Sequence, residues 1–280
     1  MSIRTEVLNL KGSLKAAAAR TYRSVLRHSP TIVYVSHGSK RDNFLKSLRE
    51  AGRVDDPNET VAIVDMGSGA TKREGVIGFD IPSNLWGGIK PQVFYGGFEW
   101  PISDNSLDGV LSTAVLEHVK CPDKYVAEMF RTLKPGGMFL TTVPFMVGQH
   151  SSPSDYQRYT PEGLQERFSQ FDIIHIGVEC GPASALSWTL RDVIASLAWN
   201  KRSHQALELV ASWGVQPIKY LDRFLVDRPY AYKSAAGLFI IGQKPDNVSN
   251  IDSDSRRESV RNWLVKLGSR NLMGIDVGPA

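Results

Sequence analysis

Short apolar runs alternate with segments of helical periodicity through the middle of the chain. Runs rich in β-branched residues are separated by stretches whose apolar residues recur with the period of a helix, and such alternation predicts a mostly parallel sheet covered by helices. The predicted strands are 61–65, 76–80, 93–95, 108–112, 138–144, 172–178 and 235–242. The predicted helices are 122–133, 161–170 and 183–199, and the second begins with Thr160 as a cap and Pro161 at the first helical position. We therefore expect an α/β fold.

The same pattern divides the chain into a principal domain with additions at both ends. From Leu10 to Leu26 apolar residues recur at every fourth position beside basic residues, which predicts an amphipathic helix that acts as a lid or packs on the domain. An extended run at 31–36, a helical pattern at 41–51 and the polar linker GRVDDPNET follow. We predict an N-terminal helical extension over 1–58, a principal domain over 59–245 with an inserted helical segment at 201–233, and a polar tail over 246–280.

Composition restricts the class of protein. With 42% hydrophobic and 22% charged residues the chain is typical of a soluble globular protein, and no apolar run is long enough to span a membrane. The net charge is only +4, and the basic residues do not alternate with aromatic ones, so we expect no nucleic-acid partner. Cys121 and Cys180 lie far apart without zinc-like spacing, which favours a reduced, cytoplasmic protein with no metal site. A divalent ion held by acidic residues stays an open alternative.

The most informative segment is VAIVDMGSGA, a predicted strand that ends at Asp65 and continues directly into Gly67 and Gly69. Glycine lets the backbone approach a ligand closely at the carboxyl edge of a parallel sheet, where open α/β sheets bind their ligands. The next strand, VIGFD, ends at Asp80, and a carboxylate there can accept hydrogen bonds from both hydroxyls of an adenosine ribose. A glycine pair alone is often only a tight turn, but the acid that follows favours a nucleoside site.

After GSG and FD, the segments WPISDNSLDGV, LEHV and LKPGG follow in order. In this series the chain, from Val61 to Pro245, resembles the class I S-adenosylmethionine-dependent methyltransferases of the type-11 group. The resemblance implies a Rossmann-like, seven-stranded, mostly parallel sheet with helices on both faces and S-adenosylmethionine as the methyl donor. It further implies that the methionine portion is held by Asp65, Gly67 and Gly69, the ribose by Asp80 and the adenine by Gly97 and Phe98, with Thr113 and Leu116 to His118 near the sulfonium.

The chain departs from the family pattern at three places. Ala70 and Thr71 stand where relatives often carry a third glycine. Only TKREGVIGF separates Ala70 from Asp80, so the helix that many relatives place there is absent or reduced to a turn. Gly96 stands where many relatives have an aspartate, which leaves adenine recognition to backbone groups and to Phe98.

The loop after the fifth strand, PFMVGQHSSPSDYQRYTPEGL, supplies candidates for the acceptor side, and a subgroup of the family has a similar H…P…DY-R-[FY]-T segment that closes over the cofactor. We expect His150 to act as a general base, Asp155 to orient its ring and His118 to contact the acceptor. Each has a structural alternative: a solvated histidine, a turn former and a capping residue. The predicted acceptor-binding residues are Tyr156, Arg158, Tyr159 and Trp188, which also suit roles in pinning the loop or packing a core helix.

These features favour methyl transfer from S-adenosylmethionine to a small polar acceptor. The polar, hydroxyl- and aromatic-rich loop from Gln149 to Tyr159 favours O-methylation of a sugar hydroxyl, so a saccharide is the expected partner. The nearest alternative is an N-methyltransferase, which needs no base. A nicotinamide-dependent dehydrogenase fits less well, because the glycine spacing lacks GxGxxG and leaves LEHV and LKPGG without a role. Self-association into a homo-oligomer stays open.

Overall fold

The computed structural model describes residues 44–45, 61–69, 74–81, 93–94, 99–150 and 154–246. The predicted helix over 10–26, the extended run at 31–36 and the tail beyond residue 246 lie outside these residues, as do Gly97 and Phe98. Of the helical pattern at 41–51, Phe44 and Leu45 are described, and both are helical and buried. The described residues cover most of the predicted principal domain.

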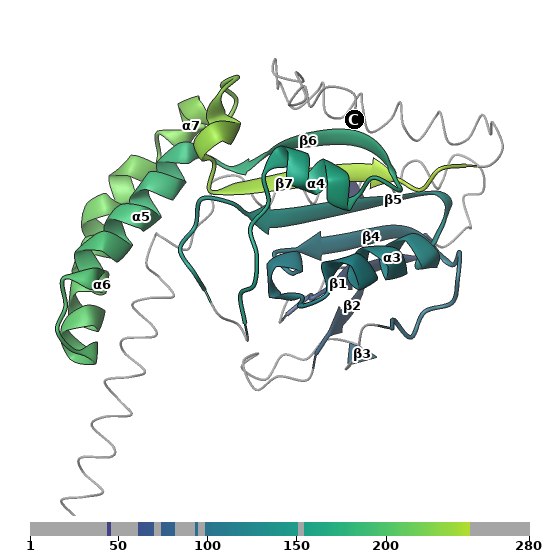
Figure 1. The fold of residues 1–280 in the computed structure, drawn as a ribbon, viewed down its shortest axis with the longest axis horizontal. Coiled ribbons are helices and arrows are strands. Elements are labelled where there is room, and N and C mark those ends of the chain that lie inside the picture. Colours follow the sequence, from purple (N-terminus) through teal and green to yellow (C-terminus); the bar gives the residue numbers. More distant parts are fainter. Residues whose placement is uncertain are drawn as a thin grey trace, which may run out of the picture.

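The seven described strands form one sheet in the order β3-β2-β1-β4-β5-β7-β6 (Figure 1). They are β1 (Ile63–Met66), β2 (Ile77–Asp80), β3 (Val93–Phe94), β4 (Leu107–Thr113), β5 (Leu133–Pro144), β6 (Asp172–Cys180) and β7 (Gly237–Gln243). Neighbouring strands from β3 to β5 are parallel, whereas β7 runs antiparallel to both of its neighbours, β5 and β6. The mostly parallel α/β sheet predicted from the hydrophobic pattern is therefore confirmed.

The described helices are α3 (Pro122–Thr132), α4 (Pro161–Arg167), α5 (Pro182–Ser196), α6 (Lys201–Lys219) and α7 (Asp222–Leu225), with short 3-10 helices η3 (Leu116–His118) and η4 (Ala231–Ser234). Their starts follow from local capping chemistry. Thr160 Oγ1 accepts the Gly163 N–H at 3.1 Å and Pro161 follows it, which confirms the predicted start of α4. The Asn200 side chain accepts the Ser203 N–H at 3.0 Å at the start of α6.

Apolar side chains alternate between the two faces of the sheet, as they do along any strand. In β7, Leu238 belongs to one buried cluster and its neighbour Phe239 to another. The first cluster includes residues of α3 and α4, which lie over the same face of the sheet in Figure 1. The second includes the helical residues Phe44 and Leu45. Helical residues therefore cover both faces, as the resemblance implies.

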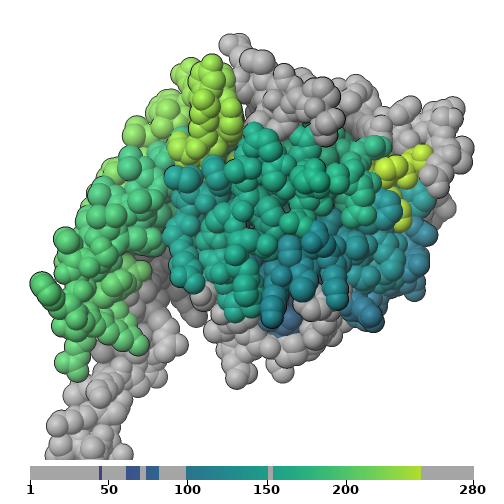
Figure 2. Space-filling view, in the orientation of Figure 1, coloured from purple at the N-terminus to yellow at the C-terminus, as the bar shows by residue number. Residues whose placement is uncertain are grey.

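Helices α5 and α6 form a hairpin that stands out from the body of the sheet (Figures 1 and 2). The two helices pack against each other, and Ser187 Oγ donates to Val215 O at 3.2 Å between them. Trp199, in the connection, is 97% exposed. None of the described helices combines the length and hydropathy that a membrane span requires. The region 201–233 contains α6, α7 and η4, so it is largely helical, whereas its status as an insertion stays a prediction.

One boundary in the sheet differs from the prediction, which ends a helix at residue 133 and starts the next strand at Met138, with the glycines of LKPGG between them. Strand β5 already begins at Leu133, which pairs with Leu107. The register then shifts between Leu107 and Gly109, and Gly136 adopts a φ of +76°, a conformation that glycine reaches without strain. The glycines of LKPGG therefore serve an irregularity within the strand rather than a separate turn.

Candidate active site

The strand order changes direction between β1 and β4, because β2 and β3 extend the sheet on one side of β1 and β4 and β5 extend it on the other. Ligands of open α/β sheets bind outside the carboxyl ends of the strands at such a point. The segments that follow β1, β4 and β5 come together there (Figure 1). We call residues 65–69 and 80, with Thr113, the cofactor half of the site, and residues 116–118, 147–150 and 154–159 the acceptor half.

Two glycines in the left-handed region shape the loop after β1. Gly67 has a φ of +75° and Gly69 a φ of +58°. The N–H groups of Gly67 and Ser68 both donate to Phe79 O, at 2.8 and 3.1 Å, which ties the loop to β2. A Cβ atom at Gly67 would lie 2.3 Å from Val115 Cγ2, in the segment after β4. Glycine is therefore required here by the close approach of Val115 as well as by the backbone conformation.

Asp80 ends β2 and is buried at the same edge of the sheet. Its Oδ2 accepts the Gly69 N–H and its Oδ1 the Ile81 N–H, each at 2.7 Å. Burial raises the pKa of this carboxyl above its ordinary value, although both hydrogen bonds oppose the shift. A carboxylate has further acceptor positions, so Asp80 can hold the glycine loop and still accept bonds from ribose hydroxyls. Asp65 is also buried, next to the end of β1.

Two buried hydroxyls in the cofactor half, Ser68 Oγ and Thr113 Oγ1, have no hydrogen-bond partner among the described residues. Buried polar groups are normally hydrogen-bonded, so such atoms mark places where a polar ligand fits. Ser68 lies between the two loop glycines and Thr113 ends β4, and both positions suit the predicted S-adenosylmethionine site. Leu116 differs, because its side chain is completely buried in the main core cluster. A cofactor contact by Leu116 therefore stays a prediction for its backbone only.

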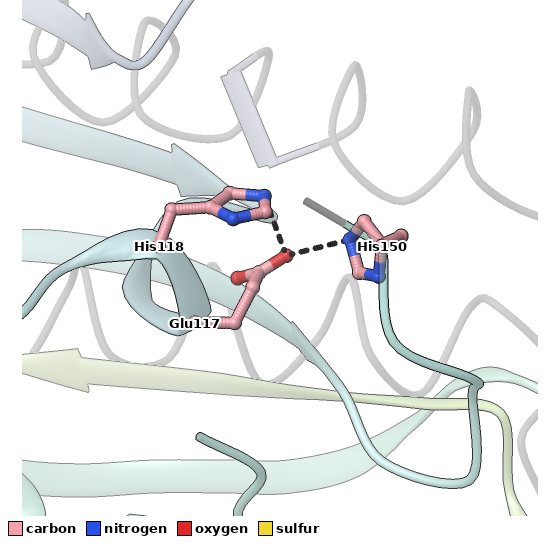
Figure 3. Close-up of side chains that lie close together, drawn as sticks. All are labelled: Glu117, His118 and His150. Atoms are coloured by element: carbon pink, nitrogen blue, oxygen red, sulfur yellow. Dashed lines mark ion pairs between the residues drawn. The ribbon is translucent and has the colours of Figure 1, made fainter. Parts of the chain in front are cut away.

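In the acceptor half, Glu117 and His118 of η3 face His150 of the loop after β5 (Figure 3). The Nε2 atoms of the two histidines each lie 3.6 Å from Glu117 Oε1. The Glu117 side chain is fully buried, and within the described residues neither of its carboxylate oxygens accepts a hydrogen bond. The His150 side chain is 44% exposed. A buried carboxylate is thus flanked by two imidazoles that come from separate segments of the chain.

Asp155 fixes the position of His150. Its Oδ2 accepts the His150 N–H at 2.8 Å and lies 3.5 Å from Nδ1 of the same residue. Arg158 pairs with Asp155 through both terminal guanidinium nitrogens, with Nη2 at 2.7 Å from Oδ2, and lowers the pKa of the Asp155 carboxyl to about 2. The Glu117 carboxylate, with a smaller effect from Asp155, raises the pKa of His150 against the opposing effect of burial. The predicted pairing of His150 with Asp155 is present in the structure.

The segment after the β5 loop is tied to η3 by main-chain groups. The Nδ1 atom of His118 is hydrogen-bonded to Ser154 O, which accepts. The Tyr156 N–H donates to Glu117 O at 2.8 Å. Gln157 Nε2 donates to two backbone carbonyls at η3 and just beyond it, each at 2.9 Å. These bonds tie η3, which carries His118, to the segment 154–157, which contains Asp155, the partner of His150.

The predicted acceptor-binding residues differ in exposure. Tyr156 is more than half exposed, whereas Tyr159 is buried, and burial raises the pKa of its phenol. Arg158 is engaged by the Asp155 carboxylate. Trp188 is only 7% exposed and belongs to a separate buried cluster, which Val147 of the acceptor half packs against. The contact of Trp188 with an acceptor stays a prediction.

The sequence places Glu117 near the sulfonium, within the segment Leu116 to His118, but gives it no role of its own. The available signal is an acidic residue within the apolar run VLEHV, directly after a buried strand. An acid in such a place is either exposed or compensated by a cationic group. Only the folded structure shows that Glu117 is buried and that His150 lies beside it.

Comparisons with known proteins match part of the chain to methyltransferases. Residues 90–141 match the type-11 family model, described as a methyltransferase domain. A protein of Mycolicibacterium smegmatis (strain ATCC 700084 / mc(2)155), named a probable S-adenosylmethionine-dependent methyltransferase, is 44% identical over 46 residues, which are 16% of this chain and 18% of that protein. The chain therefore spans less than a fifth of the length of this relative.

The solved structures that match the chain have low sequence identity and TM-scores below 0.5. Phosphoethanolamine N-methyltransferase 2 of Haemonchus contortus, in complex with phosphomonomethylethanolamine and S-adenosylhomocysteine, is 19% identical with a TM-score of 0.43, and the match covers 81% of this chain and 58% of that one. The 4+2 cyclase SpnF is 17% identical with a TM-score of 0.41, over 71% of this chain and 81% of that one. The family match thus covers residues 90–141, which include β3, β4, η3, α3 and the first part of β5.

Proposed function

We propose that the protein transfers the methyl group of S-adenosylmethionine to a hydroxyl of a small polar acceptor, in particular a sugar. The observation that carries the choice of oxygen is the buried Glu117 carboxylate between His118 and His150. A hydroxyl must lose its proton when it is methylated, so the enzyme has to provide a group that makes this loss favourable, whereas a neutral amine needs no such group. A charged cluster with one exposed imidazole suits this task.

The cofactor half is assigned to the methyl donor. Asp80 is buried beside the loop glycines and has acceptor positions left for the two ribose hydroxyls. The hydroxyls of Ser68 and Thr113 lack partners among the described residues and fit polar groups of the methionine portion. When bound, S-adenosylmethionine would supply an electrophilic methyl carbon to the acceptor oxygen and would leave as S-adenosylhomocysteine, while His150 would take the proton that the oxygen loses.

The acceptor half is assigned to holding and activating the acceptor. His150 is the exposed member of the cluster and therefore the one that an acceptor reaches. Asp155 positions His150, and Arg158 in turn holds Asp155. Tyr156 offers an exposed aromatic ring on the same loop, and aromatic faces beside charged hydrogen-bonding groups suit a polyhydroxylated acceptor.

Two measurements test this proposal in order. Calorimetric titration of the full chain is expected to show binding of S-adenosylhomocysteine and no binding of NAD. Transfer of labelled methyl from S-adenosylmethionine to a panel of sugars and amines is then expected to label sugars, and to do so far less with His150→Ala. Binding of NAD in place of S-adenosylhomocysteine would overturn the methyltransferase proposal. Labelling of amines that is equal in wild type and His150→Ala would replace O-methylation with N-methylation.

A further inference from the structure

We propose that Glu117, His118 and His150 bind a divalent transition-metal cation. Each side chain offers one ligand atom, and these atoms all lie within 4.8 Å of one another. The inference goes beyond the proposed function, because metal binding is measured without an acceptor and does not depend on which atom is methylated. It also revises the sequence expectation of a protein without a metal site, which rested on the spacing of cysteines.

The distances within the cluster are close to those of a metal site. Zinc bonds of about 2.0 to 2.1 Å in a tetrahedral arrangement place ligand atoms roughly 3.3 Å apart. Both histidine Nε2 atoms lie 3.6 Å from Glu117 Oε1. The two rings are nearly perpendicular, at 82° with centroids 5.2 Å apart, and all three ligand atoms lie within 4.8 Å of one another. Figure 3 shows the two imidazoles approaching the same carboxylate oxygen from two sides.

The unsatisfied carboxylate is a second, independent observation. Glu117 has no exposed side-chain surface, and within the described chain neither of its oxygens accepts a hydrogen bond. A buried charge without hydrogen bonds is strongly destabilising unless a cation compensates it. Arg158, a cation of the adjoining segment, is engaged by Asp155. A divalent ion between the two histidines would give Glu117 a directly bonded cation in place of these contacts at 3.6 Å.

The Nδ1 atoms of His118 and His150 lie beside oxygen acceptors, as they do in metal-binding histidines. The His118 Nδ1 atom is hydrogen-bonded to the Ser154 carbonyl. The His150 Nδ1 atom lies 3.5 Å from the Asp155 carboxylate, which is itself fixed by Arg158. A proton held at each Nδ1 leaves the lone pair at Nε2, on the side that faces Glu117, and oxygen acceptors in this position orient metal-binding imidazoles.

The ligand set indicates which class of metal is bound. Two imidazole nitrogens and one carboxylate oxygen suit zinc, iron, cobalt or nickel, whereas magnesium and calcium prefer oxygen ligands. Three protein ligands leave at least one coordination position for water or an acceptor oxygen, as in catalytic rather than structural zinc sites. The exposed His150 side of the cluster is where such a position would face the acceptor. Under this arrangement His150 acts as a ligand, and the ion takes over the acceptor activation that the sequence assigns to a free base.

The test is metal binding by the full chain after chelator treatment. Titration calorimetry with Zn²⁺ and the visible absorption of added Co²⁺ are expected to show one ion per chain. Each of Glu117→Gln, His118→Ala and His150→Ala is expected to lower the affinity by about a hundredfold or more, and Asp155→Asn by about tenfold, because removing an orienting partner costs less than removing a ligand. His204→Ala, at a half-exposed histidine of α6 outside the cluster, is the matched control and should bind as wild type does.

Folding and cofactor binding are measured on the same samples by circular dichroism and by titration with S-adenosylhomocysteine. If Glu117→Gln does not fold, His150→Ala, at an exposed loop position, still decides the question. A wild-type chain that binds neither Zn²⁺ nor Co²⁺, or variants that bind them as wild type does, would overturn the metal site and leave Glu117 paired with a protonated imidazole. Metal binding without S-adenosylhomocysteine binding would instead count against the proposed function and keep the metal site.

Discussion

The two halves of the candidate site are built from different kinds of contact. In the cofactor half, both Asp80 oxygens accept backbone N–H groups, and Gly67 and Ser68 donate to a strand carbonyl. In the acceptor half, the Glu117 oxygens accept no hydrogen bond within the described residues and face the imidazoles of His118 and His150. The shape of the cofactor half is held by main-chain hydrogen bonds and depends on a few glycine and aspartate residues. The arrangement of the acceptor half depends on each side chain of the cluster. Changes in the two halves should therefore impair different steps.

The largest expected effect is in the cofactor half. Gly67→Val should abolish binding of S-adenosylhomocysteine, because valine is strained at a φ of +75° and its Cβ would lie 2.3 Å from Val115 Cγ2. Calorimetric titration measures the loss, and circular dichroism checks that the sheet is retained. Gly214→Ala in α6, where a Cβ meets nothing within 4 Å, is the control and should leave binding unchanged. Full binding by Gly67→Val would show that the loop is only a turn.

The next effect should appear in the acceptor half alone. His150→Ala should lower kcat for a hydroxyl acceptor by roughly a hundredfold to ten-thousandfold, with the affinity for S-adenosylhomocysteine nearly unchanged. The physical reason is that His150 contacts Glu117 and Asp155 and belongs to no part of the cofactor half. Steady-state kinetics and titration on one preparation separate the two quantities. If His150→Ala also lost affinity for S-adenosylhomocysteine, the two halves would not act separately and the prediction would be wrong.

A smaller effect, on cofactor affinity rather than on kcat, is expected at Asp80. Asp80→Ala should weaken cofactor binding by about 2 to 4 kcal/mol through loss of charge-assisted hydrogen bonds to the ribose. Part of the loss arises within the protein, because the Gly69 N–H loses its acceptor. Comparing S-adenosylhomocysteine with its 2′-deoxy analogue in wild type and variant isolates the ribose contribution. If both proteins discriminate equally between the two ligands, Asp80 only supports the loop.

The smallest expected effect concerns stability rather than either half. Hydrogen bonds from Arg131 lower the pKa of Glu128, with a further contribution from the Trp100 N–H. A carboxyl whose folded pKa is depressed stabilises the fold above its unfolded pKa, and this contribution is lost as the pH falls through the folded value. Glu128→Gln should therefore cost about 1 kcal/mol at neutral pH, since the pair is partly solvated, and the cost should shrink in acid.

Urea denaturation of wild type and Glu128→Gln at about pH 7 and about pH 3 measures this difference. Glu208→Gln, which removes a loose contact of 4.0 Å with His204, is the control and should change stability little at either pH. A cost of Glu128→Gln that is the same at both values would assign the effect to packing rather than to charge.

Local chemistry made the sheet, the glycine loop and the position of Asp80 at a strand end predictable from sequence. Strand positions followed from short apolar runs such as that of β7, and the start of α4 followed from Thr160 and Pro161. The glycine loop and Asp80 were predicted together because the end of a strand, a turn and the next acid lie close in sequence. Their hydrogen bond in the structure joins residues only eleven positions apart.

Long-range packing explains what sequence did not predict. The burial of Glu117 and its approach to His150 depend on the way two segments after neighbouring strands fold toward each other. The sequence does not indicate that the side chain of Leu116 is buried in the core, which leaves only its backbone for the predicted cofactor contact. The early start of β5 depends on pairing with Leu107, which no local signal in LKPGG indicates.

The position of β7 in the sheet has a consequence for folding during synthesis. This strand lies between β5 and β6 although it comes after both in sequence, and Gln243 pairs with Met138 on one side and Asp172 on the other. During synthesis, β5 and β6 therefore present unpaired edges until residues 237–243 leave the ribosome, and exposed edges favour pairing with other chains. A ribosome stalled before Gly237 should hold a nascent protein with a formed glycine loop but an open sheet, sensitive to proteases and dependent on chaperones.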